Sequence, residues 1–189
     1  MPGKESQSFI RPDEFWQQLG LRANQTVVHL GCGAGFYLIP AAKIVGRKGK
    51  VIGIDVRTDM LSEAENKADR EGLHDIVITH HYDIEKNHDE VVASGIADWT
   101  LVANILYQAD PTKILTEAAR ITNAKGTIVV VEWDIAATPL GPPSDTRVAK
   151  REVEKVAAAR SLKLIKEFEP SPYHYGLLFK KSGDEASDT

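Results

Sequence analysis

The chain has 189 residues, which is enough for one domain with a full core and short for two. Hydrophobic residues make up 42% and charged residues 26%, ordinary values for a globular protein. The formal net charge of −4 argues against a protein that grips nucleic acid through its phosphates. The single cysteine, Cys32, excludes an internal disulfide and a cysteine-rich metal site.

No apolar run approaches the length of a membrane-spanning helix, and the N-terminus lacks the apolar segment of a signal peptide. These features predict a cytoplasmic protein without a membrane span. The C-terminal residues, SGDEASDT, are small, polar and acidic. We therefore expect a single domain over residues 1–182, followed by a disordered tail over 183–189.

Strand-like and helical stretches alternate along most of the chain. Helices are expected over 12–20, 36–46, 58–72, 86–93 and 110–126, and strands over 26–31, 50–55, 76–81, 97–104 and 127–133. Thr58 is the expected N-cap of the third helix, and Gly72 and Gly126 are expected to close the third and fifth. After a Pro/Gly-rich connection, a helix over 148–160 precedes strands over 161–169 and 174–181, which are close enough to form a hairpin.

The strands are nearly continuous apolar, β-branched runs, as in parallel sheets that are buried on both faces. Alternation with helices predicts right-handed crossovers and a doubly wound α/β sheet. The terminal hairpin makes the last strand antiparallel to its neighbour. Ligands of such sheets bind beyond the carboxyl ends of the strands.

A glycine-rich segment lies at the first strand-to-helix junction, where Gly31, Gly33 and Gly35 allow a sharp turn and close approach to a ligand. A dinucleotide fingerprint would need a glycine at Phe36, which disfavours a nucleotide-dependent oxidoreductase. Asp55, at the end of the second strand, can accept hydrogen bonds from both hydroxyls of a ribose. By themselves the glycines are equally compatible with a tight turn that binds nothing.

Five segments in order, HLGCGAG, VIGIDVRTDML, HHYDIE, WTLVANILYQADP and GTIVVVEW, resemble the motif series of class I S-adenosylmethionine-dependent methyltransferases. The similarity covers roughly residues 12–180 and is nearest to small-molecule enzymes of the quinone-biosynthesis type. The resemblance implies a Rossmann-like, seven-stranded mixed sheet with the last strand antiparallel and helices on both faces. It also implies S-adenosyl-L-methionine as the cofactor and transfer of its methyl group to a small or medium-sized acceptor.

The resemblance assigns the cofactor-binding residues by their place in these motifs. Glycine-loop residues would line the methionine part, Asp55 would hold the ribose, and Asp83 would accept from the adenine amino group. Val56 and Met60 would pack the adenine, and Asn104 would lie near the transferred methyl group. The full set is His29, Leu30, Gly31, Cys32, Gly33, Asp55, Val56, Met60, Asp83, Ile84 and Asn104.

His29 departs from the family pattern, which has an acidic residue at this position near the cofactor's ammonium group. A neutral imidazole supplies no negative charge, and a protonated one would repel the cofactor. We therefore expect cofactor affinity to fall as the pH drops through about 6.5, and a His29→Asp variant to bind more tightly. The alternative is a buried histidine satisfied by the backbone, with a neighbour contacting the ammonium.

Methyl transfer requires alignment more than a dedicated catalytic group, and the sequence contains no catalytic motif. Asn104, Tyr107 and His174 are weak catalytic candidates, with His174 as a possible base. Candidate substrate-binding residues are Tyr107, Trp133, Arg147 and Tyr173. The alternative to a functional role for each residue is a structural one, packing at the surface or in the hairpin. For Arg147 the alternative is an exposed charge at the start of a helix.

No metal site is expected. His80 and His81 are adjacent on a strand and point to opposite faces, so they would not chelate together with Asp83; His88 and Asp89 follow nearby. Two alternatives of function stay open: a non-catalytic S-adenosylmethionine-binding or scaffold protein, and an RNA or protein methyltransferase. The expected partner is a small-molecule acceptor rather than nucleic acid, bound by a monomer or homodimer.

Overall fold

The computed structural model describes residues 10–86, 91–136 and 140–183. Its helices are α1 (Pro12–Leu19), α2 (Leu38–Val45), α3 (Thr58–Arg70), α4 (Pro111–Ile121) and α5 (Lys150–Ala158), with a 3-10 turn over Ile84–Lys86. Its strands are β1 (Thr26–Leu30), β2 (Lys50–Asp55), β3 (Val77–His81), β4 (Ala97–Ala103), β5 (Thr122–Trp133), β6 (Leu162–Ser171) and β7 (His174–Lys181).

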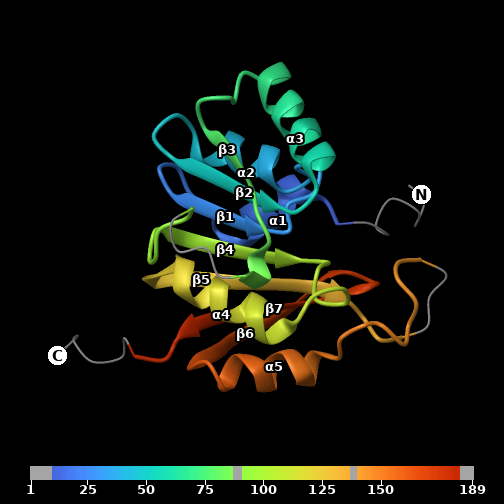
Figure 1. Cartoon of the computed structure of the whole chain (residues 1–189). Coiled ribbons are helices and arrows are strands. Elements are labelled where there is room, and N and C mark those ends of the chain that lie inside the picture. The colour runs from blue at the N-terminus through green and yellow to red at the C-terminus, as the bar shows by residue number, and fades with distance from the viewer. Residues whose placement is uncertain (1–9, 87–90, 137–139, 184–189) are drawn as a thin grey trace, which may run out of the picture.

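All seven strands form one sheet in the order β3-β2-β1-β4-β5-β7-β6 (Figure 1). The pairs among the first five strands are parallel, whereas β7 runs antiparallel to both β5 and β6. The strand order reverses at β1 and β4, which places a switch point beside the glycines that follow β1. The predicted seven-stranded mixed sheet with an antiparallel last strand is confirmed.

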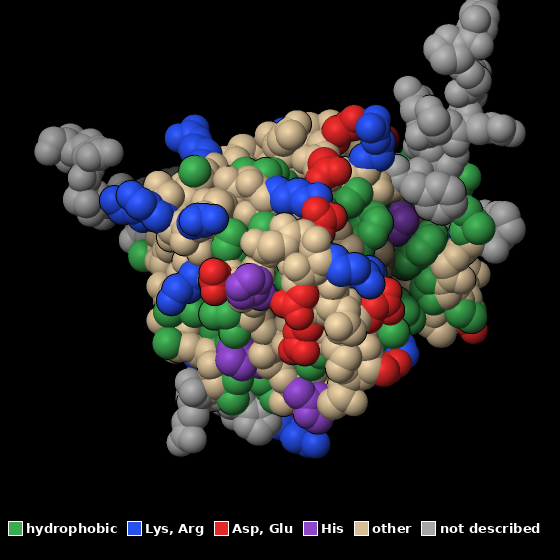
Figure 2. Space-filling model, turned by 90° about the horizontal axis from the view of Figure 1, so that it is seen from above, with side chains coloured by type: hydrophobic (Ala, Val, Ile, Leu, Met, Phe, Trp, Pro, Cys, Tyr) green, Lys and Arg blue, Asp and Glu red, His purple; other side chains and the backbone are tan. Residues whose placement is uncertain are grey.

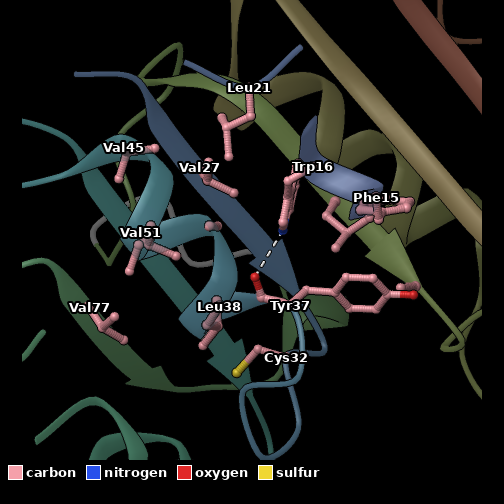
Figure 3. Packing of buried hydrophobic residues seen from close by; sticks show 14 of the residues in the cluster. Phe15, Trp16, Leu21, Val27, Cys32, Tyr37, Leu38, Val45, Val51 and Val77 are labelled. Carbon is pink, nitrogen blue, oxygen red and sulfur yellow. Dashed lines mark hydrogen bonds between the residues drawn. The ribbon is translucent and has the colours of Figure 1, made fainter. Parts of the chain in front are cut away.

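Helices cover both faces of the sheet, and each face has its own apolar core (Figure 1). One core packs α1, α2 and α3 against the sheet, and the other packs α4 and α5. In the first core, the indole N–H of Trp16 donates to the carbonyl of Tyr37 at 2.9 Å (Figure 3). This bond fixes the backbone just before α2, so α1 helps to position the segment that follows the glycines.

The boundaries of three expected helices differ from the prediction. The fifth ends at Ile121, and Thr122 begins β5 instead of continuing to Gly126. The hydroxyl of Thr122 lies 2.7 Å from that of Thr100 on β4 and donates to the Ala118 carbonyl, so sheet pairing takes over from helix. α3 begins at Thr58 with Arg57 as its N-cap residue and ends at Arg70, before Gly72.

The helix expected over 86–93 is replaced at its start by the 3-10 turn Ile84–Lys86, and residues 87–90 lie outside the described residues. Of the residues expected in the tail, 184–189 are likewise not described. Within the described ranges, no helix is long and apolar enough to cross a membrane. Those ranges also contain no cluster of three metal-binding side chains; His88 and Asp89 fall outside them.

Candidate functional site

A cavity of about 380 Å³ lies at the carboxyl edge of the sheet, where β1, β2 and β4 end. Eight of the residues assigned from the sequence line it: Gly31, Gly33, Asp55, Val56, Met60, Asp83, Ile84 and Tyr107. The wall is completed by residues to which the sequence analysis gave no cofactor-binding role, namely Arg57, Glu85, Ile105, Gln108, Ala109 and Ile114. The fold thus brings together side chains that are up to 83 positions apart, from Gly31 to Ile114.

The glycine loop (residues 31–35) contributes Gly31 and Gly33 to the cavity wall, and all three of its glycines have φ in the left-handed region. At Gly31 a Cβ would lie 2.5 Å from the Cδ1 of Ile105, so a larger residue requires the Ile105 side chain to move. At Gly33 a Cβ would meet nothing within 4 Å, which leaves open space above the backbone. The loop therefore combines a packed glycine with an open one that a ligand can approach closely.

Asp55 joins the glycine loop to the end of β2. One carboxylate oxygen accepts the N–H of Gly33 at 2.8 Å, and the other accepts the N–H of Arg57 at 2.9 Å. Carboxylates hydrogen-bonded in this way hold a fixed orientation and keep further lone pairs for another donor. Asp55 is thus oriented at the cavity with capacity to accept from a hydroxyl-bearing ligand.

Asp83 occupies the next strand end along the sheet. Its carboxylate accepts the N–H of Glu85 at 3.0 Å and pairs with Lys86 at 3.3 Å. The Glu85 backbone N–H, followed by Lys86, lowers the pKa of the Asp83 carboxyl below its ordinary value. The carboxylate is therefore ionised near neutral pH and available as an acceptor, flanked by the apolar side chains of Val56, Met60 and Ile84.

The segment after β4, residues 104–109, is named the β4 loop, and its residues Ile105, Tyr107, Gln108 and Ala109 line the cavity. Asn104 begins this loop with φ of 54°, a left-handed conformation that Asn adopts more readily than most residues. The Oδ1 atom of Asn104 is buried and has no hydrogen-bond partner. A buried amide oxygen without a partner indicates a position where a ligand's donor group completes the hydrogen bonding.

His29 is almost fully buried on β1, packed edge-on against the Tyr37 ring at 5.5 Å, and it does not line the cavity. Neither of its ring nitrogens has a hydrogen-bond partner, so the expectation of a histidine satisfied by the backbone is wrong. Burial lowers the pKa of His29 to about 3. The expected loss of cofactor affinity near pH 6.5 from protonation of His29 is therefore withdrawn, because a neutral ring persists far below that pH.

We predict that His29→Phe stabilises the free protein by about 1 kcal/mol, because two unpartnered nitrogens are replaced by apolar carbon. The gain should grow as the pH falls from about 6.5 toward 3, since the histidine charges in the unfolded chain but not in the fold. Chemical denaturation at pH 7.5 and pH 5 measures both effects. Equal or lower stability of the variant at both pH values would show that His29 has a polar partner.

Leu30 and Cys32, also assigned to the cofactor, are buried in opposite cores. The Cys32 side chain points into the α2 side of the sheet (Figure 3), where burial, followed by the nearby Asp55 charge, raises the pKa of its thiol to about 12. The Cys32 backbone N–H donates to the Ile54 carbonyl. Both residues therefore shape the glycine loop from beneath, and their side chains do not line the cavity.

Most substrate candidates lie apart from this cavity, around the ends of β5 and β7. The ring of Trp133 stacks on that of His174 at 4.1 Å, and the Arg147 guanidinium lies 5.5 Å from the Trp133 ring centre. Arg147 is buried rather than exposed, and it donates to the carbonyls of Asp134, Ala136, Leu140 and Pro142. This arrangement favours a structural role for Arg147, as the residue that ties down the connection between β5 and α5.

His174 forms part of a separate cavity of about 270 Å³ with Tyr175 and Lys150. Its Nδ1 lies 2.7 Å from the Ser171 hydroxyl, which also accepts the N–H of Tyr173. Burial, followed by the Arg147 charge, lowers the pKa of His174 to about 4. Tyr173, the remaining candidate, sits in the hairpin turn, where its carbonyl accepts the N–H of Asp134.

The residue that sequence reasoning missed most clearly is Glu132. It is buried on β5, and one carboxylate oxygen accepts the N–H groups of both Ile105 and Leu106 at 2.7 Å. These residues belong to the β4 loop, whose Ile105 packs over Gly31. The available signal was an acidic residue inside an otherwise apolar strand, VVVEW, because such a residue requires partners when buried.

The family model described as a methyltransferase domain matches residues 21–169. The solved structure of an S-adenosylmethionine-dependent methyltransferase from Aquifex aeolicus superimposes with a TM-score of 0.83 at 25% identity, over 94% of this chain and 93% of that one. The fold is that of class I S-adenosylmethionine-dependent methyltransferases, which confirms the class predicted from the motif series. The chain belongs to the methyltransferase domain family.

Two curated relatives act on small molecules according to their names. Demethylmenaquinone methyltransferase of Oceanobacillus iheyensis is 27% identical over 116 residues, which cover 61% of this chain and 48% of that protein. Aklanonic acid methyltransferase DauC of Streptomyces sp. (strain C5) is 38% identical over 71 residues, covering 33% of this chain and 32% of that protein. The chain thus matches about a third to a half of the length of these relatives.

Proposed function

We propose that the protein binds S-adenosyl-L-methionine in the 380 Å³ cavity and transfers its methyl group to a small-molecule acceptor. The observation that carries the proposal is the alignment of Gly33, Asp55 and Asp83 along one cavity at the carboxyl edge of β1, β2 and β3. The open backbone at Gly33 suits the methionine part of the cofactor, and the oriented carboxylates of Asp55 and Asp83 suit its ribose and its adenine. The family membership of the chain supports the same ligand.

The residues present fit this cofactor. The open space over Gly33 admits a ligand chain, and Asp55 retains acceptor capacity for ribose hydroxyls. Asp83 can accept from an exocyclic amine, and Val56 and Met60 offer apolar surface to the adenine ring. The unpartnered Oδ1 of Asn104 provides an acceptor at the β4 side. His29, Leu30 and Cys32, which the resemblance assigned to the cofactor, do not line the cavity.

The bound cofactor supplies a methyl group on a positively charged sulfur, which leaves as a neutral thioether. The protein's part is to orient the two reactants so that the acceptor atom, the methyl carbon and the sulfur lie in line. The glycine loop and Asp55 would fix the donor, and Tyr107 of the β4 loop lines the same cavity, whereas Asn104 is not among the residues that line it. His174, the base suggested by the sequence, lies in the separate cavity of about 270 Å³ and has a lowered pKa, so this geometry does not support it as the base.

A small aromatic or polyketide-like acceptor is the form of the proposal that the two curated relatives favour. Acidic and basic side chains are intermixed on the face that carries α3 and the β3 end of the sheet (Figure 2). That distribution gives nucleic acid no uniform basic surface on this face. Trp133 and Tyr173 stay predictions for acceptor binding, as do a cytoplasmic location, a single domain over 1–182, and a monomer or homodimer.

The test is calorimetric titration of the purified protein with S-adenosylmethionine, S-adenosylhomocysteine and NAD. We expect micromolar binding of the two sulfur compounds and none of NAD. Methyl-labelled cofactor with hydroxylated quinones, aromatic polyketides and total RNA then identifies the acceptor class. If neither sulfur compound binds, the enzyme proposal is overturned and a scaffold of the same fold is favoured. Label in RNA alone would overturn the small-molecule acceptor.

A further inference from the structure

Glu132 is a buried carboxyl whose surroundings contain no countercharge among the described residues. Its side chain is 1% exposed, and both hydrogen-bond donors to its Oε1 are backbone N–H groups, those of Ile105 and Leu106. Burying a carboxylate is costly, so its retention between apolar strand neighbours requires a compensating role. By contrast Glu117, the other buried glutamate on this side of the sheet, pairs with Arg120 at 2.7 Å.

The two N–H groups that Glu132 holds connect it directly to the cofactor cavity. Ile105 lines that cavity, and its Cδ1 occupies the space that a Cβ on Gly31 would need. Tyr107 and Gln108, further along the β4 loop, also line the cavity. The carboxylate therefore sets the distance between the β4 loop and the glycine loop, although it does not itself face the cavity.

Among Glu132 and the described titratable groups near it, Glu132 alone changes its charge near neutral pH. Burial raises the pKa of Glu132 to about 7, opposed by the N–H groups of Leu106 and Ile105. Tyr37, before α2, and Tyr175, on β7, both have a raised pKa, partly because of the Glu132 charge, and stay neutral. His29 and His174 titrate well below neutrality.

We propose that Glu132 is a positioning residue that must be ionised to hold the β4 loop against the glycine loop, so that cofactor binding strengthens as the pH rises through neutrality. The inference rests on the proposed function, because it assumes that the cofactor occupies this cavity. Backbone N–H groups bond more strongly to a carboxylate than to a neutral carboxyl. Ionisation and closure of the β4 loop therefore favour each other, as linkage requires.

The first test is the pH profile of S-adenosylmethionine affinity, measured by calorimetry between pH 6 and pH 8. If only the ionised form binds well, the competent fraction rises from about a tenth to about nine tenths, which is a gain of about tenfold. Glu132→Gln, which has no ionised form, should bind no more tightly than the wild type does at pH 6 and should show no rise. Retention of the wild-type profile by Glu132→Gln would overturn the proposal.

Glu117→Gln is the matched control, since it also replaces a buried glutamate but leaves the β4 loop untouched. It should keep the tenfold rise.

The stability of the free protein should change with pH in the direction opposite to cofactor affinity. Because the pKa of Glu132 is raised in the fold, its burial destabilises the free protein increasingly as the pH rises from about 4.5 to 7. Glu132→Gln removes that loss, so its melting temperature should exceed that of the wild type at pH 8.

A second measurement needs neither a variant nor a ligand. Hydrogen exchange of the Ile105 and Leu106 amides in the free wild-type protein, corrected for intrinsic rates, should show protection rising several-fold between pH 6 and pH 8. Flat protection would overturn the role of Glu132. Rising protection without cofactor binding at any pH would instead overturn the proposed function and leave the role of Glu132 in place.

Discussion

Replacement of Asp55 by alanine is expected to weaken S-adenosylmethionine binding by at least about 30-fold while the protein stays folded. The carboxylate orients the glycine loop through the Gly33 N–H at 2.8 Å and the start of α3 through the Arg57 N–H at 2.9 Å. Loss of hydrogen bonds to a charged acceptor costs about 2 kcal/mol, which corresponds to this factor. Calorimetric titration of both proteins measures the change.

Asp59→Ala is the control for Asp55→Ala. Asp59 lies four positions further on, pairs with Arg57 at 2.8 Å, and is exposed. It carries the same charge but does not line the cavity, so its removal should change affinity by less than about twofold. Similar losses in the two variants would mean that overall charge, rather than a contact of Asp55, governs binding.

Gly31→Ala is expected to abolish measurable cofactor binding. Two effects combine at this position: a φ of 73°, which costs a residue with a Cβ about 1–2 kcal/mol, and a collision with the Cδ1 of Ile105 at 2.5 Å. Relief of the collision requires Ile105 to move, and Ile105 lines the cavity. Calorimetry and chemical denaturation together separate the loss of binding from the loss of stability.

Gly20→Ala isolates the backbone contribution. Gly20 ends α1 with φ of 84°, and a Cβ there meets nothing within 4 Å. Its stability loss should match the backbone part of the Gly31 effect, with cofactor binding unchanged. Adding Ile105→Val to Gly31→Ala removes the Cδ1 atom and should restore part of the affinity. If the double variant binds no better than Gly31→Ala, the collision is not the cause.

The local chemistry of the site was readable from the sequence because it depends on short segments. Glycines at alternate positions after an apolar run indicate a turn with unusual φ, and the structure gives Gly31, Gly33 and Gly35 positive φ values. Asp55 ends β2 and Asp83 lies two residues after β3, and the carboxyl ends of parallel strands meet at one edge. The alternation of strands and helices likewise predicted the doubly wound sheet, and the short connection of the terminal hairpin predicted its antiparallel last strand.

The environment of each side chain was decided by tertiary structure. His29 and Asp55 both follow from local patterns, yet one is sealed between the sheet and the Tyr37 ring while the other borders the cavity. Burial, which depends on every layer of the fold, moves the pKa of His29 to about 3 and that of Glu132 to about 7. No window of sequence contains that information.

Long-range contacts account for the remaining surprises. Arg147 looks like a free cation in the sequence, but the connection from β5 to α5 folds its own carbonyls around it. In the sequence Glu132 is a single polar residue within an apolar strand. Because β4 and β5 are neighbours, its carboxylate accepts the N–H groups of Ile105 and Leu106, which are 27 and 26 positions away. The sequence by itself indicated the order of most strands and helices and the strand ends that border the cavity. The tertiary structure decided which polar groups are buried, because burial and pairing depend on residues that only the folded sheet brings together.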